Sequence, residues 1–233
     1  MTDPATPPRR LTCTEHTRPA AEAVLFQARG VGGADGLFRV EGSHRVYDGL
    51  VVDVRIDDVV MPGGRIAARE VVEHDNAVAV VALDDAGSVV MLEQYRHPLG
   101  RRLWELPAGL MDMDGEDART AAARELAEET GLTARSWSVL VDVATSPGFC
   151  TEVVRVFLAR DLTDVGREVP DGDEETDLRV VLIPLADAVA AVYQGTVVNA
   201  STVAGILAAA AWADAGSSGA GITLRPADAP WSG

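Results

Sequence analysis

The alternation of apolar and polar positions predicts a chain rich in short strands, with strands before and after one long polar helix. Residues 50–60 and 65–72 each alternate, and Pro62-Gly63-Gly64 between them predicts the turn of a β-hairpin. The continuous apolar run at 77–83 predicts a buried strand, with 89–95 as its partner across a polar turn. Further strands are expected at 102–106, 137–144, 153–159 and 178–183.

Three helices are expected among these strands, at 116–130, 185–193 and 201–213. Gly131 gives the first of them its C-terminal stop. Because strands and helices do not alternate strictly, their order predicts an α+β fold, an α-β-α sandwich built on a mixed sheet.

Four segments follow from this pattern. Residues 1–45 are rich in Pro, Thr, Arg, Ala and Gly, and we expect a flexible N-terminal extension. Residues 46–75 are expected to form an N-terminal β-hairpin and 76–215 the main domain. The Ser, Gly and Pro content of 216–233 predicts a flexible tail.

Composition narrows the classes of function. The net charge of -16 argues against nonspecific binding to nucleic acid or to an anionic membrane, since both attract basic surfaces. Cys13 and Cys150 have no metal-ligand spacing, and the N-terminus has no apolar leader. We therefore predict a soluble, cytoplasmic protein with no nucleic-acid or membrane partner.

The most informative chemistry lies on the first expected helix. Glu125, Glu128 and Glu129 stand at i, i+3 and i+4, so a helix places all three on one face. Like charges this close repel each other, and a divalent cation between them removes the repulsion. Oxygen ligands favour Mg²⁺, with Mn²⁺ as the alternative. The competing interpretation is a solvated helix with ordinary Arg–Glu pairs.

The spacing of these residues resembles the Nudix box. Glu116 is followed after seven residues by Arg124-Glu125-Leu126-x-Glu128-Glu129-x-Gly131-Leu132, which matches the helical part of that motif completely. The entry differs, because six residues separate Gly109 from Glu116 where the usual form has five. The resemblance implies that 76–215 is a Nudix hydrolase domain.

Within that family the chain is similar to ADP-ribose pyrophosphatases. The segments that carry this second resemblance are Gln94-Tyr95-Arg96, Trp104-Glu105-Leu106-Pro107-Ala108-Gly109, Pro147 and Glu174-Glu175. The resemblance implies Mg²⁺-dependent hydrolysis of ADP-ribose to AMP and ribose 5-phosphate. It also implies a homodimer in which the hairpin at 46–75 is exchanged between subunits.

The resemblance assigns roles to individual residues. The expected metal ligands are Glu125, Glu128, Glu129 and the carbonyl of Ala108. Glu175, or alternatively Glu174, is expected to orient or deprotonate the attacking water, so that Glu129 and these two form the catalytic set. For substrate, Arg96 is expected to bind phosphate oxygens, Glu105 to accept hydrogen bonds from ribose hydroxyls, and Pro147 to shape the loop across the cleft.

Alternatives stay open at each level. Arg96 is equally consistent with an ordinary surface ion pair, and the acidic loop around Glu174 and Glu175 with a solvated one. The substrate alternative is another nucleoside diphosphate derivative, either a nucleotide sugar or a dinucleotide. A third hypothesis is a non-catalytic sensor that binds ADP-ribose.

Overall fold

The computed structural model describes residues 38–167, 177–219 and 221–231. Glu174 and Glu175, together with residues 1–37 of the expected extension, lie outside the described residues. The described helices lack the combination of length and hydrophobicity that a membrane-spanning helix needs.

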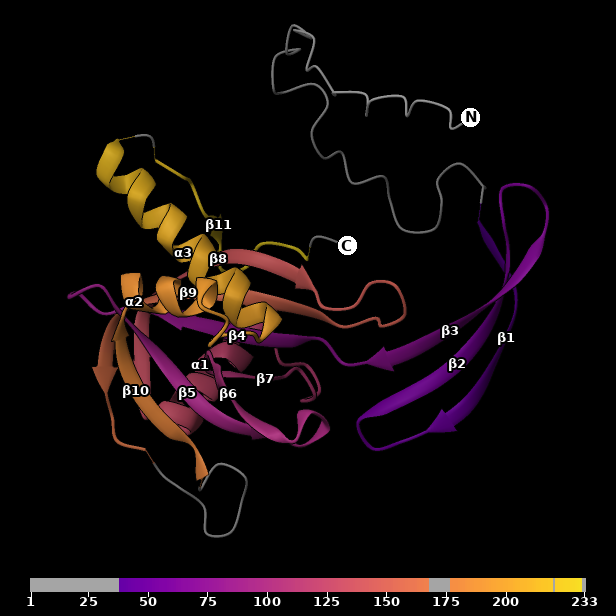
Figure 1. Cartoon of the computed structure of the whole chain (residues 1–233), viewed down its shortest axis with the longest axis horizontal. Coiled ribbons are helices and arrows are strands. Elements are labelled where there is room, and N and C mark those ends of the chain that lie inside the picture. The colour runs from indigo at the N-terminus through magenta and orange to yellow at the C-terminus, as the bar shows by residue number, and fades with distance from the viewer. Residues whose placement is uncertain (1–37, 168–176, 220, 232–233) are drawn as a thin grey trace, which may run out of the picture.

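A three-stranded antiparallel sheet stands to one side of the chain (Figure 1). It consists of β1 (Arg39–Asp48), β2 (Val52–Val60) and β3 (Ile66–His74), with β2 in the middle. The predicted hairpin is present as β2 and β3, and its turn closes with a 2.8 Å hydrogen bond from the Met61 N–H to the Arg65 carbonyl.

Strand β1 is a departure from the sequence analysis, because it begins inside the expected extension and makes the hairpin a three-stranded sheet. Nine of its ten residues are exposed. A strand with so little burial carries no apolar alternation, so the pattern gave no signal for it.

The rest of the chain forms two sheets. The larger contains β4 (Ala77–Ala82), β7 (Ala108–Leu110), β8 (Leu132–Ala144), β9 (Val153–Asp164) and β11 (Arg225–Pro226), in the order β11-β8-β9-β4-β7. Its β4 and β9 are parallel and its other pairs antiparallel, so the sheet is mixed as predicted. The smaller is antiparallel, with the order β10-β5-β6, from β5 (Ser88–Arg96), β6 (Arg101–Glu105) and β10 (Arg179–Pro184). A short 3-10 helix, η1 (His97–Leu99), connects β5 to β6.

The predicted pairing of 77–83 with 89–95 is wrong. Strands β4 and β5 belong to different sheets, and only one isolated bridge joins Leu83 to Val89. Every residue of β4 is buried. A strand that is apolar on both faces fits the middle of a covered sheet, and its sequence does not say which strands flank it.

Helices cover both faces of the larger sheet (Figure 1). Val78 and Val80 of β4 pack with α1 (Ala118–Thr130), whereas Ala79 and Val81 pack with α2 (Leu185–Tyr193) and α3 (Ala200–Ser218). The alternation of one strand between two apolar clusters confirms the α-β-α arrangement.

The C-terminal residues also depart from the sequence analysis, which expected a flexible tail from 216. Helix α3 continues to Ser218, and β11 pairs with β8. Beyond β11, the buried Arg155 donates to the carbonyls of Ala229 at 2.6 Å and Pro230 at 2.9 Å. Backbone carbonyls accept these bonds, so the tail's composition gave no indication of them.

Asp142 of β8 is expected to make the free energy of unfolding depend on pH in the acidic range. Burial raises its pKa, but hydrogen bonds from Arg155 and Arg225 outweigh burial and lower the pKa to about 2, from an ordinary value of 3.8. Because its pKa is lowered in the folded state, the Asp142 carboxylate stabilises the fold fully above about pH 4. This stabilisation is lost as the pH falls toward 2. At about 1.4 kcal/mol per pKa unit, the loss is on the order of 2 kcal/mol. Urea unfolding between pH 6 and 2.5 measures it, and Asp142→Asn should flatten this part of the pH profile.

Candidate active site

Both ends of α1 are fixed by local hydrogen bonds. The Asp117 carboxylate accepts from the backbone N–H groups of Arg119 and Thr120, each at 3.0 Å, so the helix begins at Ala118. At the other end Gly131 has a φ of 73°, and a Cβ there would lie 2.5 Å from the backbone nitrogen of Arg167. The predicted stop at Gly131 is confirmed, and the register of the helix is set from both ends.

Arg124 binds three carboxylates, one from the entry loop and two from α1. Its Nε and Nη2 donate to Glu116 at 3.1 and 3.0 Å, and its Nη1 donates to Glu125 at 2.6 Å and to Glu128 at 3.1 Å. These bonds, led by those to Glu116, raise the pKa of Arg124 above its ordinary value although burial opposes them. The arginine therefore supplies positive charge that keeps the glutamates together.

The backbone of β7 meets the other side of this cluster. Glu129 is only 5% exposed, and its Oε2 accepts a 2.9 Å hydrogen bond from the Ala108 N–H. A Cβ built at Gly109 would lie 2.1 Å from the Oε1 of Glu125. The carboxylates of α1 are thus pressed against the strand that carries Ala108, whose carbonyl is the expected backbone ligand.

The donor set fits a hard divalent cation. Glu125, Glu128 and Glu129 offer only oxygen atoms, and the absence of a side chain at Gly109 leaves room for the Glu125 carboxylate. Among the described residues, no three His, Cys, Asp or Glu side chains are already arranged around one point as a metal site. Arg124 holds Glu125 and Glu128 by direct ion pairs.

The additional residue of the entry loop is accommodated by turns that precede α1. The Met111 N–H donates to the Asn76 carbonyl at 2.8 Å, and the Glu116 N–H donates to the Met113 carbonyl at 3.1 Å. Gly115, with a φ of 79°, sits within this second turn. The additional residue therefore changes the loop while Gly109 still meets Glu125.

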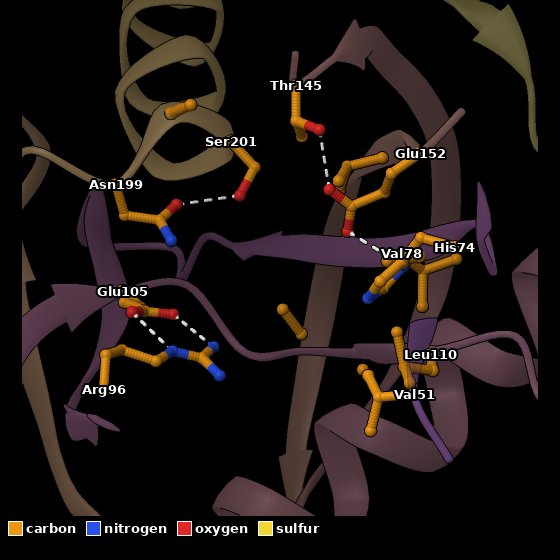
Figure 2. A pocket seen from close by; sticks show the side chains of 15 residues that line it. Val51, His74, Val78, Arg96, Glu105, Leu110, Thr145, Glu152, Asn199 and Ser201 are labelled. Atoms are coloured by element: carbon orange, nitrogen blue, oxygen red, sulfur yellow. Dashed lines mark hydrogen bonds and ion pairs between the residues drawn. The ribbon is translucent and has the colours of Figure 1, made fainter. Parts of the chain in front are cut away.

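A cavity of about 390 Å³ lies beside β7 (Figure 2). The predicted Arg96, Glu105 and Ala108 all line it. Arg96 and Glu105 also bind each other, with Nε–Oε1 at 2.9 Å and Nη2–Oε2 at 2.6 Å. Arg96 does make an ion pair, as the alternative interpretation of the sequence allowed. Its partner is the buried Glu105, and both residues line the pocket.

A model of the NUDIX domain matches residues 73–200, which is more than half of the chain. The chain belongs to the Nudix family.

Relatives of this Nudix protein include two bacterial enzymes. It is 51% identical over 172 residues to an ADP-ribose pyrophosphatase of Mycobacterium tuberculosis, covering 73% of this chain and 82% of that one. It is 40% identical over 158 residues to an ADP-ribose pyrophosphatase of Bacillus subtilis, covering 68% and 84%. A crystal structure of an ADP compounds hydrolase superposes with a TM-score of 0.68 at 21% identity, covering 77% of this chain and 95% of the other. This last likeness concerns the fold alone.

Pro147 does not line the pocket of this Nudix protein. It is exposed, at a turn closed by hydrogen bonds from the Phe149 and Cys150 N–H groups to the Ser146 carbonyl. The loop's ends line the pocket instead, through Thr145 and Glu152. Its middle is bonded to β3, where the Val72 N–H donates to the Phe149 carbonyl at 2.7 Å. The loop therefore connects the N-terminal sheet to the site.

Sequence reasoning missed several polar residues of the pocket. Figure 2 shows Thr145, Glu152 and His74 on the side opposite Arg96 and Glu105. Glu152 accepts from the Thr145 hydroxyl at 2.7 Å and lies 3.8 Å from Nδ1 of His74. His74 ends β3, whereas Thr145 and Glu152 are the two ends of the loop after β8, and no spacing in the sequence links that loop to His74.

A further pair, Asn199 and Ser201, stands at the start of α3. The Ser201 hydroxyl donates to Oδ1 of Asn199 at 2.8 Å, and that oxygen also caps the helix by accepting from the Thr202 N–H at 3.0 Å. Both residues line the pocket, and neither was expected there from the sequence.

Replacing Arg96 with alanine is expected to destabilise the protein as well as the site. Glu105 is 2% exposed and would lose both hydrogen bonds from Arg96. Because the Arg96 side chain is 41% exposed, water can reach one side of the vacated space, and we expect a loss of about 1–3 kcal/mol. Urea unfolding measures this loss. Arg101→Ala, an exposed arginine on the adjoining strand, is the control, and equal losses for the two would contradict the role of the buried pair.

Proposed function

We propose that this Nudix protein is a Mg²⁺-dependent pyrophosphatase that hydrolyses ADP-ribose to AMP and ribose 5-phosphate. The observation that carries the proposal is the contact of two box glutamates, Glu125 and Glu129, with the backbone of β7, beside a pocket that Arg96 and Glu105 line. The similarity to two ADP-ribose pyrophosphatases, over most of each enzyme, supports the substrate.

The residues that would hold Mg²⁺ are Glu125, Glu128, Glu129 and the Ala108 carbonyl, with Mn²⁺ as the alternative metal. When bound, such a cation neutralises diphosphate charge and makes a coordinated water more acidic. Glu116 keeps Arg124 beside the helix through two hydrogen bonds of its own. Arg124 can therefore yield Glu125 and Glu128 to a cation without leaving the cluster.

Substrate contacts are proposed for the two sides of the pocket. Glu105 retains lone pairs beyond those that Arg96 uses, so it can still accept from ribose hydroxyls. Arg96 is fixed by Glu105, which orients its planar guanidinium toward phosphate oxygens. Thr145 and Glu152, across the cavity, offer further partners for hydroxyl groups.

Glu175, with Glu174 as the alternative, is proposed to orient or deprotonate the attacking water. Both lie outside the described residues, but Asp177 pairs with Arg102 of β6, the strand that carries Glu105. Asp177, the first described residue after them, is thus held at β6. Turnover of Glu174→Gln and Glu175→Gln at saturating Mg²⁺ distinguishes the two, and normal turnover in both would remove the loop from catalysis.

A homodimer is proposed through the N-terminal sheet. A sheet whose apolar side chains face solvent offers a surface that a second subunit can cover. Val40, Val46, Tyr47, Leu50 and Ile66 are each more than half exposed. Sedimentation velocity tests the proposal, and a monomer at micromolar concentration would contradict it. The cytoplasmic location stays a prediction.

Product analysis over a panel of substrates tests the function. We expect ADP-ribose to give AMP and ribose 5-phosphate in equal amounts, with a higher kcat/KM than nucleotide sugars or dinucleotides. A higher value for another nucleoside diphosphate derivative would replace the substrate and keep the chemistry. Binding of ADP-ribose without hydrolysis would favour the sensor, which the retention of Glu116, Glu125, Glu128 and Glu129 argues against.

A further inference from the structure

A single buried arginine fixes the C-terminal segment, residues 225–231. Arg155 lies in β9 and is 2% exposed. Besides its hydrogen bonds to the carbonyls of Ala229 and Pro230, its guanidinium lies 4.3 Å from the centroid of the Trp231 ring. The NUDIX domain match ends at residue 200, so this segment lies beyond the part of the chain that defines the family.

Inside the protein, Arg155 pairs with the carboxylate of Asp142, which it shares with Arg225. Asp142 accepts from its Nε at 2.8 Å and its Nη2 at 3.1 Å, and also accepts from Arg225 at 2.8 Å. An apolar residue at position 155 would leave the buried Asp142 carboxylate without this partner, which is costly. Beyond its pairing with Asp142, Arg155 fixes the C-terminal carbonyls.

The C-terminal segment lies near the entry loop that precedes α1. Ala227, Ala229 and Trp231 pack against the same apolar cluster as Met111 of the entry loop, a cluster that includes Ala118 of α1. A cavity of about 640 Å³ lies between the two. Its lining residues are Met111, Glu116, Asp117, Ala118 and Arg119 on one side, and Arg155 and residues 227–231 on the other. The C-terminal segment therefore forms the side of this cavity opposite the entry loop, which contains Glu116.

Glu116 connects that loop to the proposed metal ligands. It holds Arg124 by two hydrogen bonds, and Arg124 holds Glu125 and Glu128. We propose that residues 225–231 position the entry loop, 111–117, and through Glu116 and Arg124 set the affinity of α1 for divalent cations. This inference rests on the proposed metal role of α1. The segment is a positioning element and touches neither substrate nor cation.

Trp231→Ala and Trp212→Ala form a matched pair for the test. Both tryptophans are partly buried and each lies beneath an arginine, since Arg160 lies 5.6 Å from the Trp212 ring centroid. Trp212 belongs to α3 and packs in the cluster on the other face of the sheet. Trp231→Ala leaves the four hydrogen bonds of Arg155 in place, so we expect the variant to fold.

Two readouts are needed, both on the substrate-free full chain. Hydrogen exchange is expected to be several-fold faster at 111–117 in Trp231→Ala and unchanged there in Trp212→Ala. Outer partners of metal ligands alter affinity by about 10–100-fold when removed. The segment acts further out, through the entry loop, Glu116 and Arg124, so the Mg²⁺ dissociation constant, measured by calorimetry, should rise by about 3- to 10-fold in Trp231→Ala alone.

Unchanged exchange at 111–117 in Trp231→Ala, or an unchanged dissociation constant, would overturn the inference. So would an equal rise of the dissociation constant in Trp212→Ala, because it would indicate general loosening. If the wild-type protein binds no Mg²⁺, the proposed function fails, and the exchange measurement still decides whether the segment controls the loop.

Discussion

Glu129→Gln is expected to lower the turnover of ADP-ribose by about 10³-fold or more. Removing a residue that only hydrogen-bonds to a metal ligand already lowers affinity or activity by about 10–100-fold. Glu129 is proposed to be a ligand itself, so its loss should cost more. The fold should survive, because glutamine has the same shape and its amide oxygen can still accept from the Ala108 N–H. The loss would therefore be a loss of negative charge at one buried position.

Steady-state turnover at saturating Mg²⁺, together with the melting temperature, measures this effect. Glu93→Gln is the control, because Glu93 lies on β5 and faces Arg179 at a loose 3.9 Å. Normal turnover in Glu129→Gln, with Mg²⁺ binding intact, would show that the assignment of Glu129 is wrong.

Gly109→Ala is expected to abolish most of the activity at little cost in stability. Gly109 is not among the glycines with positive φ, so its backbone accepts alanine. The new Cβ would lie 2.1 Å from Oε1 and Cδ of Glu125, and one of them must move. Since this is the end of a flexible side chain, the carboxylate can swing away. We expect the free energy of unfolding to fall by about 1 kcal/mol or less. Turnover should fall by about 100-fold or more.

The control for this substitution is Gly216→Ala. Gly216 is exposed on α3, and a Cβ there meets no atom within 4 Å. Activity and Mg²⁺ affinity should be unchanged in the control and both reduced in Gly109→Ala. A Gly109→Ala enzyme with normal Mg²⁺ affinity would contradict the placement of Glu125.

The helical part of the site could be predicted because its geometry is local. The spacing of Glu125, Glu128 and Glu129 follows the helical repeat, and Gly131 requires a left-handed conformation that suits a helix end. The i, i+4 spacing also accounts for the hydrogen bond between Arg124 and Glu128. The two hydrogen bonds to Glu116 depend on how the loop enters the helix, and spacing does not encode that.

Contacts between distant segments could not be predicted. His74 and Glu152 meet because β3 is bonded to the loop after β8, which only the assembled sheets determine. The capture of the C-terminal carbonyls by Arg155 likewise joins positions more than 70 residues apart. Strand β4 was recognised from its apolar run, but a strand that is apolar on both faces does not specify its neighbours.

A crystal structure with Mg²⁺ and a non-hydrolysable ADP-ribose analogue tests the central claim most directly. The account predicts cations bound by Glu125, Glu128, Glu129 and the Ala108 carbonyl, with the analogue's diphosphate against them and its riboses between the Arg96–Glu105 pair and Glu152. It also predicts that Arg124 keeps Glu116 and releases Glu125 and Glu128. Cations bound away from α1, or an analogue seated outside this pocket, would contradict it.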